Sequence, residues 1–93
     1  VLANINTSAL EYAPAISADE LELFFTRMTG VLFWRRLQVL HATRSHREAP
    51  FDTPLVVAAI DGVVEAPTLS SDGRSLYFHK KVEGVHRIFR VTR

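Results

Sequence analysis

The sequence predicts an all-β protein built from two small antiparallel sheets. Short runs of apolar, aromatic and β-branched residues alternate with turn-forming residues along the whole chain. A segment of the first half also recurs in the second half. No stretch shows a sustained helical period with a cap at both ends, and residues 30–40, the nearest approach to one, are not expected to form a helix.

Length and composition set the broad class. The 93 residues are expected to form one domain, residues 1–93, and an apolar content of 47% excludes a disordered chain. The net charge of +1 gives no global field for nucleic acid or an anionic membrane, so neither is expected as a partner. Cysteine is absent, which excludes disulfides and thiolate metal sites, and no cofactor is expected. No signal peptide is visible at the start, so the compartment stays open between cytoplasm and periplasm.

Turn signals bound each predicted strand. Asp61-Gly62, Asp72-Gly73 and Glu83-Gly84 are tight-turn signals, because glycine accepts a positive φ without a steric penalty. Residues 44–54 are polar, contain two prolines and are predicted as a loop. The predicted strands in chain order are Val1–Ile5, Ala15–Ser17, Leu21–Arg27, Leu37–Thr43, Leu55–Ile60, Thr68–Ser70, Ser75–Lys80 and Arg87–Thr92.

Two parts of the chain are similar to each other. Residues 11–19 align with residues 64–72 at an offset of 53, which pairs Pro14 with Pro67 and Asp19 with Asp72. Residues 39–44 align with residues 88–93 at an offset of 49, so the first copy carries four extra residues between positions 28 and 36. Repeats of roughly 40 to 50 residues made of strands are typical of β-propeller blades, which places repeat one at about 11–60 and repeat two at about 64–93.

The motif of the second repeat resembles a known family. Residues 67–78, which read Pro-Thr-Leu-Ser-Ser-Asp-Gly-Arg-Ser-Leu-Tyr-Phe, together with Ile-Phe-Arg-Val at 88–91, look like the WD40-like propeller repeat of TolB-type proteins. The first repeat matches less well, because Glu20 replaces the turn glycine. The resemblance implies two four-stranded antiparallel propeller-like blades and a scaffold that displays loops, without implying one activity.

Two blades are fewer than the four or so that a closed propeller needs. The first repeat has four predicted strands and the second has three, so Arg87–Thr92 would be left as an open edge. We therefore predict that Val1–Ile5 completes the second blade beside Arg87–Thr92, within the chain or from a neighbouring copy. The blades are expected to be completed by self-association, with the chain itself or another protein as the partner.

The polar residues do not form a recognised catalytic or metal site. Ser70, Asp72 and His79 lie close in sequence, but no Gly-x-Ser-x-Gly elbow is present and turn chemistry explains Ser70 and Asp72. The four histidines lack a known ligand spacing. We assign no catalytic or metal residue, and we predict a protein that is not an enzyme.

Surface and turn residues remain as candidates. The extra residues of the first repeat contain an apolar run that we predict to be an interface: Val31, Leu32, Phe33 and Trp34. Candidate ligand or surface residues are Arg35, Arg36, His79 and Arg90, and the structural turn residues are Asp19, Asp72 and Gly73. The first hypothesis is a non-enzymatic interaction or scaffold module. The alternatives are a module that binds a small ligand or glycan between blades, and a small hydrolase.

Overall fold

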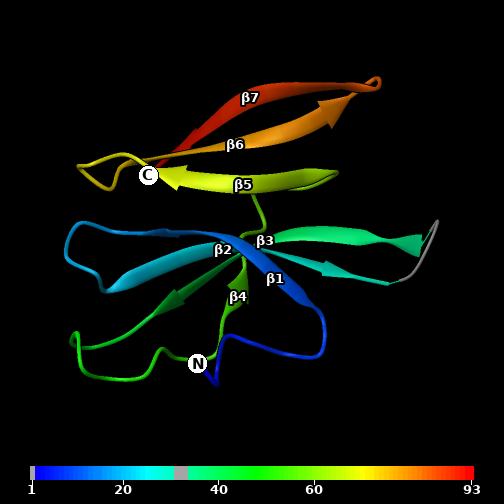
Figure 1. Ribbon diagram of the computed structural model, residues 1–93. Helices are drawn as coiled ribbons and strands as arrows, with labels where there is room; N and C mark the ends of the chain where they lie inside the picture. Colours follow the sequence, from blue (N-terminus) through cyan, green and yellow to red (C-terminus); the bar gives the residue numbers. More distant parts are fainter. Residues whose placement is uncertain (1, 31–33) are drawn as a thin grey trace.

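The computed structural model describes residues 2–30 and 34–93, and it contains two antiparallel sheets (Figure 1). Sheet A has the order β1-β2-β3-β4, and sheet B has the order β5-β6-β7. The strands are β1 (Leu10–Ile16), β2 (Glu22–Thr29), β3 (Arg36–Thr43), β4 (Leu55–Val56), β5 (Val64–Leu69), β6 (Ser75–Val82) and β7 (Val85–Thr92). Within each sheet consecutive strands are neighbours, and the prediction of an all-β fold with small antiparallel sheets is confirmed.

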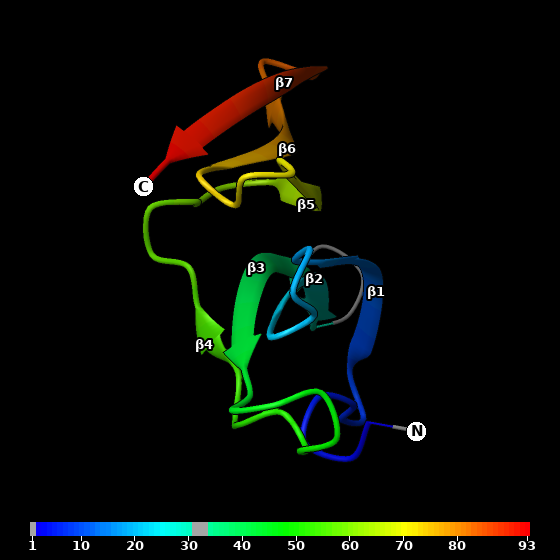
Figure 2. The ribbon, with the colours of Figure 1, turned by 90° about the vertical axis from the view of Figure 1, so that its left-hand side faces the viewer.

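The two sheets lie face to face as two layers (Figure 1). The inner faces bury Phe24 and Val39 of sheet A against Leu76 and Phe78 of sheet B. A segment between β4 and β5 joins the sheets along one side (Figure 2), and its Ile60 packs into the same cluster. The contact between the sheets is therefore a continuous apolar core.

The outer face of sheet A has a second apolar cluster. Leu23, Phe25 and Leu40 project from β2 and β3 on this side, and they are covered by Ile5 and Phe51 from outside the strands. Because β2 is buried on both faces, its apolar residues do not alternate with polar ones. Sheet B differs, because no described segment of the chain covers its outer face.

The backbone repeats as the sequence does. The pairing of β1 with β2 is interrupted by a bulge between Tyr12 and Ala15, and that of β5 with β6 between Glu65 and Thr68. Each bulge holds an Ala-Pro pair whose alanine has a positive φ, 52° at Ala13 and 58° at residue 66. Proline has no N–H to donate, and a bulge leaves it outside the ladder. Both strands therefore begin earlier than predicted and continue through the proline.

The turns after β1 and β5 have matching hydrogen bonds. The hydroxyl of Ser17 donates to Asp19 Oδ1 at 2.6 Å, and that of Ser70 donates to Asp72 Oδ1 at 2.7 Å. These hydroxyl hydrogen bonds are the main reason why the pKa of both aspartates is lowered. In each turn the same aspartate oxygen also accepts a backbone N–H two residues further on, at 3.0 Å. The two turns are thus built by the same side chains in the same roles.

The four extra residues of the first repeat lie in one hairpin. Thr29 pairs with Arg36 at the end of the β2–β3 hairpin, while Val82 pairs with Val85 at the end of the β6–β7 hairpin. Six residues of the sequence thus separate the paired Thr29 and Arg36, and two separate the paired Val82 and Val85. Equivalent residues of the two repeats are therefore 53 positions apart before this hairpin and 49 apart after it, as in the sequence alignment.

Two predictions about strands need correction. The second sheet has three strands, and within the described residues none pairs with the free edge of β7. Residues 2–5 form a turn in which the N–H groups of Ile5 and Asn6 both donate to the carbonyl of Leu2. Val1 lies outside the described residues. An equivalent turn, with Ile60 N–H donating to Val57 O at 3.0 Å, ends β4 at Val56, earlier than predicted.

Candidate functional site

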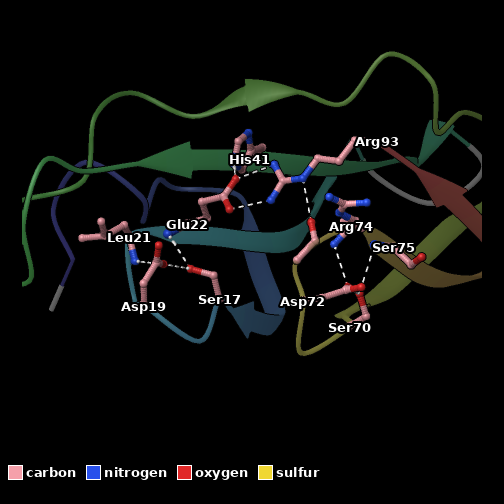
Figure 3. A network of polar contacts seen from close by, with 11 residues as sticks. Ser17, Asp19, Leu21, Glu22, His41, Ser70, Asp72, Arg74, Ser75 and Arg93 are labelled. Atoms are coloured by element: carbon pink, nitrogen blue, oxygen red, sulfur yellow. Dashed lines mark hydrogen bonds and ion pairs between the residues drawn. The ribbon is translucent and has the colours of Figure 1, made fainter.

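The contact between the sheets is the most elaborate polar site of the described chain (Figure 3). Arg93, which follows β7, donates from Nη1 and Nη2 to the two carboxylate oxygens of Glu22 on β2, each at 2.6 Å. His41 Nε2 lies 3.0 Å from the same carboxylate. The hydrogen bonds from Arg93 are the main cause of the lowered pKa of Glu22. This bidentate pair links the end of β7 in sheet B to β2 in sheet A.

The opposite edge of the contact has its own hydrogen bonds. Tyr12 of β1 donates its hydroxyl to Glu65 Oε2 of β5 at 2.8 Å. Burial, followed by this contact with Glu65, raises the pKa of Tyr12 to about 12. The N–H of Ala66 donates to the fully buried Thr26 Oγ1 at 3.0 Å, so the bulge of sheet B is attached directly to β2. These contacts place β5 across the strands of sheet A.

The outer face of sheet B is the repeat equivalent of the inner face of sheet A. At the offset of 53, Tyr77 corresponds to Phe24, and at the offset of 49, Ile88 corresponds to Val39. Phe24 and Val39 are 5% and 0% exposed because sheet B covers them. Tyr77 and Ile88 are 40% and 65% exposed. The outer face of sheet B is therefore equivalent to a buried face of sheet A, but no described residue outside sheet B packs on it.

The outer face of sheet A, at the other end of the stack, exposes the equivalents of residues that pack between the sheets. Leu69 and Val57 pack at the edge of the core between the sheets. Their equivalents in the first repeat are Ile16, at an offset of 53, and Leu2, at an offset of 55 that the matching turns support. Ile16 and Leu2 are 48% and 46% exposed. The two ends of the molecule thus expose apolar residues from the two different halves of one repeated interface, although Ile5 and Phe51 already cover the centre of the half on sheet A.

Two cavities lie beside the contact. The larger has a volume of about 870 Å³, and its lining includes Tyr12, Arg35, Arg36, Asp61 and Glu65. The smaller has a volume of about 240 Å³ and lies on the Arg93 side. The larger cavity therefore combines an aromatic ring, two guanidinium groups and two carboxylates, which is a suitable set for a polar ligand.

The structure separates the residues that the sequence singled out. Arg35 and Arg36 line the larger cavity, whereas His79 and Arg90 lie on β6 and β7 and face outward from sheet B. Trp34 is 83% exposed. The rest of the predicted apolar interface, Val31, Leu32 and Phe33, lies outside the described residues. The arginine pair and the outward-facing pair belong to two different surfaces.

The residues considered for catalysis contact residues of their own sheet. Ser70 Oγ donates to Asp72 and also accepts the N–H of Ser75 at 3.0 Å. The ring of His79 packs against that of His86, with centroids 6.4 Å apart. Among residues 2–30 and 34–93, no three His, Asp or Glu side chains are arranged to hold a metal ion. The same residues include no helix of the length and hydropathy required to cross a membrane.

The sequence interpretation missed the polar residues at the sheet contact. Glu22 and Arg93 are separated by 71 positions, and neither belongs to a recognisable motif. The repeat makes Arg44 and Arg93 equivalent at an offset of 49, but it gives no signal for the contact with Glu22. Arg44 Nε donates to Glu20 O at 2.8 Å just as Arg93 Nε donates to Gly73 O at 2.7 Å.

Comparison with family models, with curated proteins and with solved structures gives no match to this chain.

Proposed function

We propose that the protein is a non-enzymatic interaction module of the β-propeller type, and that copies of the chain stack head to tail. In this arrangement the outer face of sheet B of one copy packs on the outer face of sheet A of the next. The observation that carries the proposal is the exposure of apolar residues from both halves of the repeated interface, Tyr77 and Ile88 at one end and Leu2 and Ile16 at the other.

The stacking of sheet B on sheet A provides the template for this contact. It packs Phe24 and Val39 together with Leu69 and Val57, and the chain exposes the repeat equivalents of these four residues at its two ends. Contacts between two different surfaces produce a ring when the rotation closes. Two copies would supply four sheets and three copies six, both within the range of propeller blades. The resemblance of residues 67–78 to a propeller repeat supports the same arrangement.

Sedimentation velocity over a range of concentrations tests the proposal. We expect an oligomer whose association weakens at least tenfold in Ile88→Asp, because burying an isoleucine contributes about 2 kcal/mol and a buried carboxylate costs more. Leu55→Asp is the matched control, since Leu55 is 73% exposed on β4 and belongs to neither end face. A wild-type protein that stays monomeric at millimolar concentration would overturn the proposal.

The larger cavity favours a second candidate function, the binding of a polar ligand such as a glycan. Tyr12 could stack on a sugar ring, while Arg36 and Glu65 could bind its hydroxyl groups. A glycan array probed with the wild type and with Arg36→Ala tests this candidate. Binding that survives the substitution, or the absence of binding to any glycan, would contradict it.

A further inference from the structure

The smaller cavity corresponds to a site that the first repeat fills with a phenylalanine. Phe51, which follows β3, is 3% exposed and packs against Leu23 and Ala42 on the outer face of sheet A. The guanidinium carbon of Arg44 lies 4.3 Å from the centre of its ring. A side chain amide, Asn4 Nδ2, donates to the carbonyl of Phe51 at 2.7 Å. Apolar side chains and a cation thus surround this ring, and a turn residue binds the backbone of Phe51.

Each of these four residues around Phe51 has an equivalent around the smaller cavity. Leu76 and Val91 stand for Leu23 and Ala42, and Arg93 stands for Arg44. Ala59, from the turn that matches residues 2–5, stands for Asn4. No described residue of the chain supplies an equivalent of Phe51, and the cavity of about 240 Å³ is larger than the roughly 150 Å³ that holds a benzene molecule.

The free edge of β7 beside the smaller cavity is equivalent to the edge of β3 that pairs with β4. The segment containing Phe51 continues into β4, whose Leu55 and Val56 pair with β3. Along it, Thr43 O accepts the N–H of Asp52 at 2.7 Å and Val39 O accepts that of Val57 at 2.9 Å. The equivalent carbonyls on β7 belong to residues 88 and 92, at the edge with which no described strand pairs. An extended peptide can add to such an edge by main-chain hydrogen bonds.

We propose that the β7 edge and the smaller cavity together bind an extended peptide segment with a phenylalanine anchor in the cavity. The segment carries its phenylalanine four positions before a pair of apolar residues, as Phe51 precedes Leu55 and Val56. It is acidic, because residues 74–93 contain six Lys and Arg against a single Glu. This site is distinct from the sheet faces of the proposed function, and it does not depend on their association.

A labelled peptide with the sequence of residues 49–58, Ala-Pro-Phe-Asp-Thr-Pro-Leu-Val-Val-Ala, tests the site by fluorescence anisotropy with the whole protein. We expect saturable binding that weakens at least tenfold when the peptide phenylalanine is changed to alanine. We also expect weaker binding when its aspartate is changed to lysine. Equal binding of the phenylalanine and alanine peptides, or no binding of either, would overturn the proposal.

Protein variants locate the binding within the molecule. Ala59→Phe should fill the cavity from its rim and weaken peptide binding at least tenfold, and Ala59 is exposed, so the larger side chain requires no repacking of the core. Ala58→Phe is the matched control, because the neighbouring Ala58 is also exposed and lines the larger cavity. Peptide binding that is unchanged in Ala59→Phe, or lost equally in both variants, would contradict the assignment.

Discussion

Glu20 and Gly73 occupy the same position in equivalent turns, and they differ in how well they suit it. Their φ angles are 63° and 73°, in the left-handed region that a side chain disfavours by about 1 kcal/mol or more. In both turns the residue donates its N–H to the serine carbonyl at 2.9 Å. The first repeat thus holds a glutamate in a glycine conformation, because the serine–aspartate hydrogen bonds fix the turn around it.

Exchanging the two turn residues should therefore have opposite effects. We expect Glu20→Gly to raise the free energy of unfolding by about 0.5–1 kcal/mol, and Gly73→Glu to lower it by about 1 kcal/mol or more. The side chain of Glu20 contributes little, because its ion pair with Arg47 is exposed. Urea denaturation measures both changes. A stabilising Gly73→Glu, or a destabilising Glu20→Gly, would show that the two turns are not equivalent.

At the scale of the elements, the sequence predicts more about strands than about the contacts between them. The alternation of strand runs and turn signals locates most strands, and the two offsets, 53 and 49, predict which hairpin is longer. The predicted starts of β1 and β5 are wrong, because Pro14 and Pro67 look like strand breakers until a bulge accommodates them. Residues 1–5 were predicted as a strand because they are apolar, although Asn4 and Asn6 favour the turn that residues 2–5 form.

The polar contacts of the candidate site could not be predicted in this way. The pairing of Glu22 with Arg93 depends on how sheet B stacks on sheet A, which the pattern within each strand does not specify. The same limit applies to the smaller cavity, whose enclosure combines residues from both sheets and from the segment that joins them. The equivalence of the two repeats is the one feature of the sequence that relates residues of sheet A to residues of sheet B. The structure shows this equivalence at individual residues.

The link between the sheets should make stability depend on pH. The pKa of Glu22 is lowered by Arg93 below its ordinary value of 4.5, so ionised Glu22 favours the folded state, and this contribution is lost as the pH falls through the folded pKa. We expect Glu22→Gln to cost about 0.5–1 kcal/mol at neutral pH and to differ less from the wild type at pH 3.

Chemical denaturation at several pH values measures this difference. Other carboxylates with a lowered pKa, such as Asp19 and Asp72, titrate in both proteins, so they cancel in the comparison. Glu83→Gln, at an exposed turn of sheet B, is the control that should leave the pH profile unchanged. Parallel profiles for the wild type and Glu22→Gln would show that the ion pair does not stabilise the contact between the sheets.

At the scale of the whole molecule, two sheets are stacked and each end of the stack differs from the other. A chain of 93 residues buries a smaller share of its surface than larger domains do, so association would add appreciably to its stability. The outer face of sheet B presents Tyr77 and Ile88, and the outer face of sheet A presents Leu2 and Ile16. A head-to-tail contact joins two unlike surfaces, whereas a two-fold contact would join like ones.

Mixing two variants, each with one disabled end, distinguishes these contacts most directly. Ile88→Asp disables the outer face of sheet B, and Ile16→Asp disables the outer face of sheet A. Each variant keeps the half of the interface that the other lacks. By native mass spectrometry we expect each variant alone to be a monomer, and an equimolar mixture to form a dimer with one copy of each. A mixture that stays monomeric while the wild type associates would contradict the head-to-tail contact.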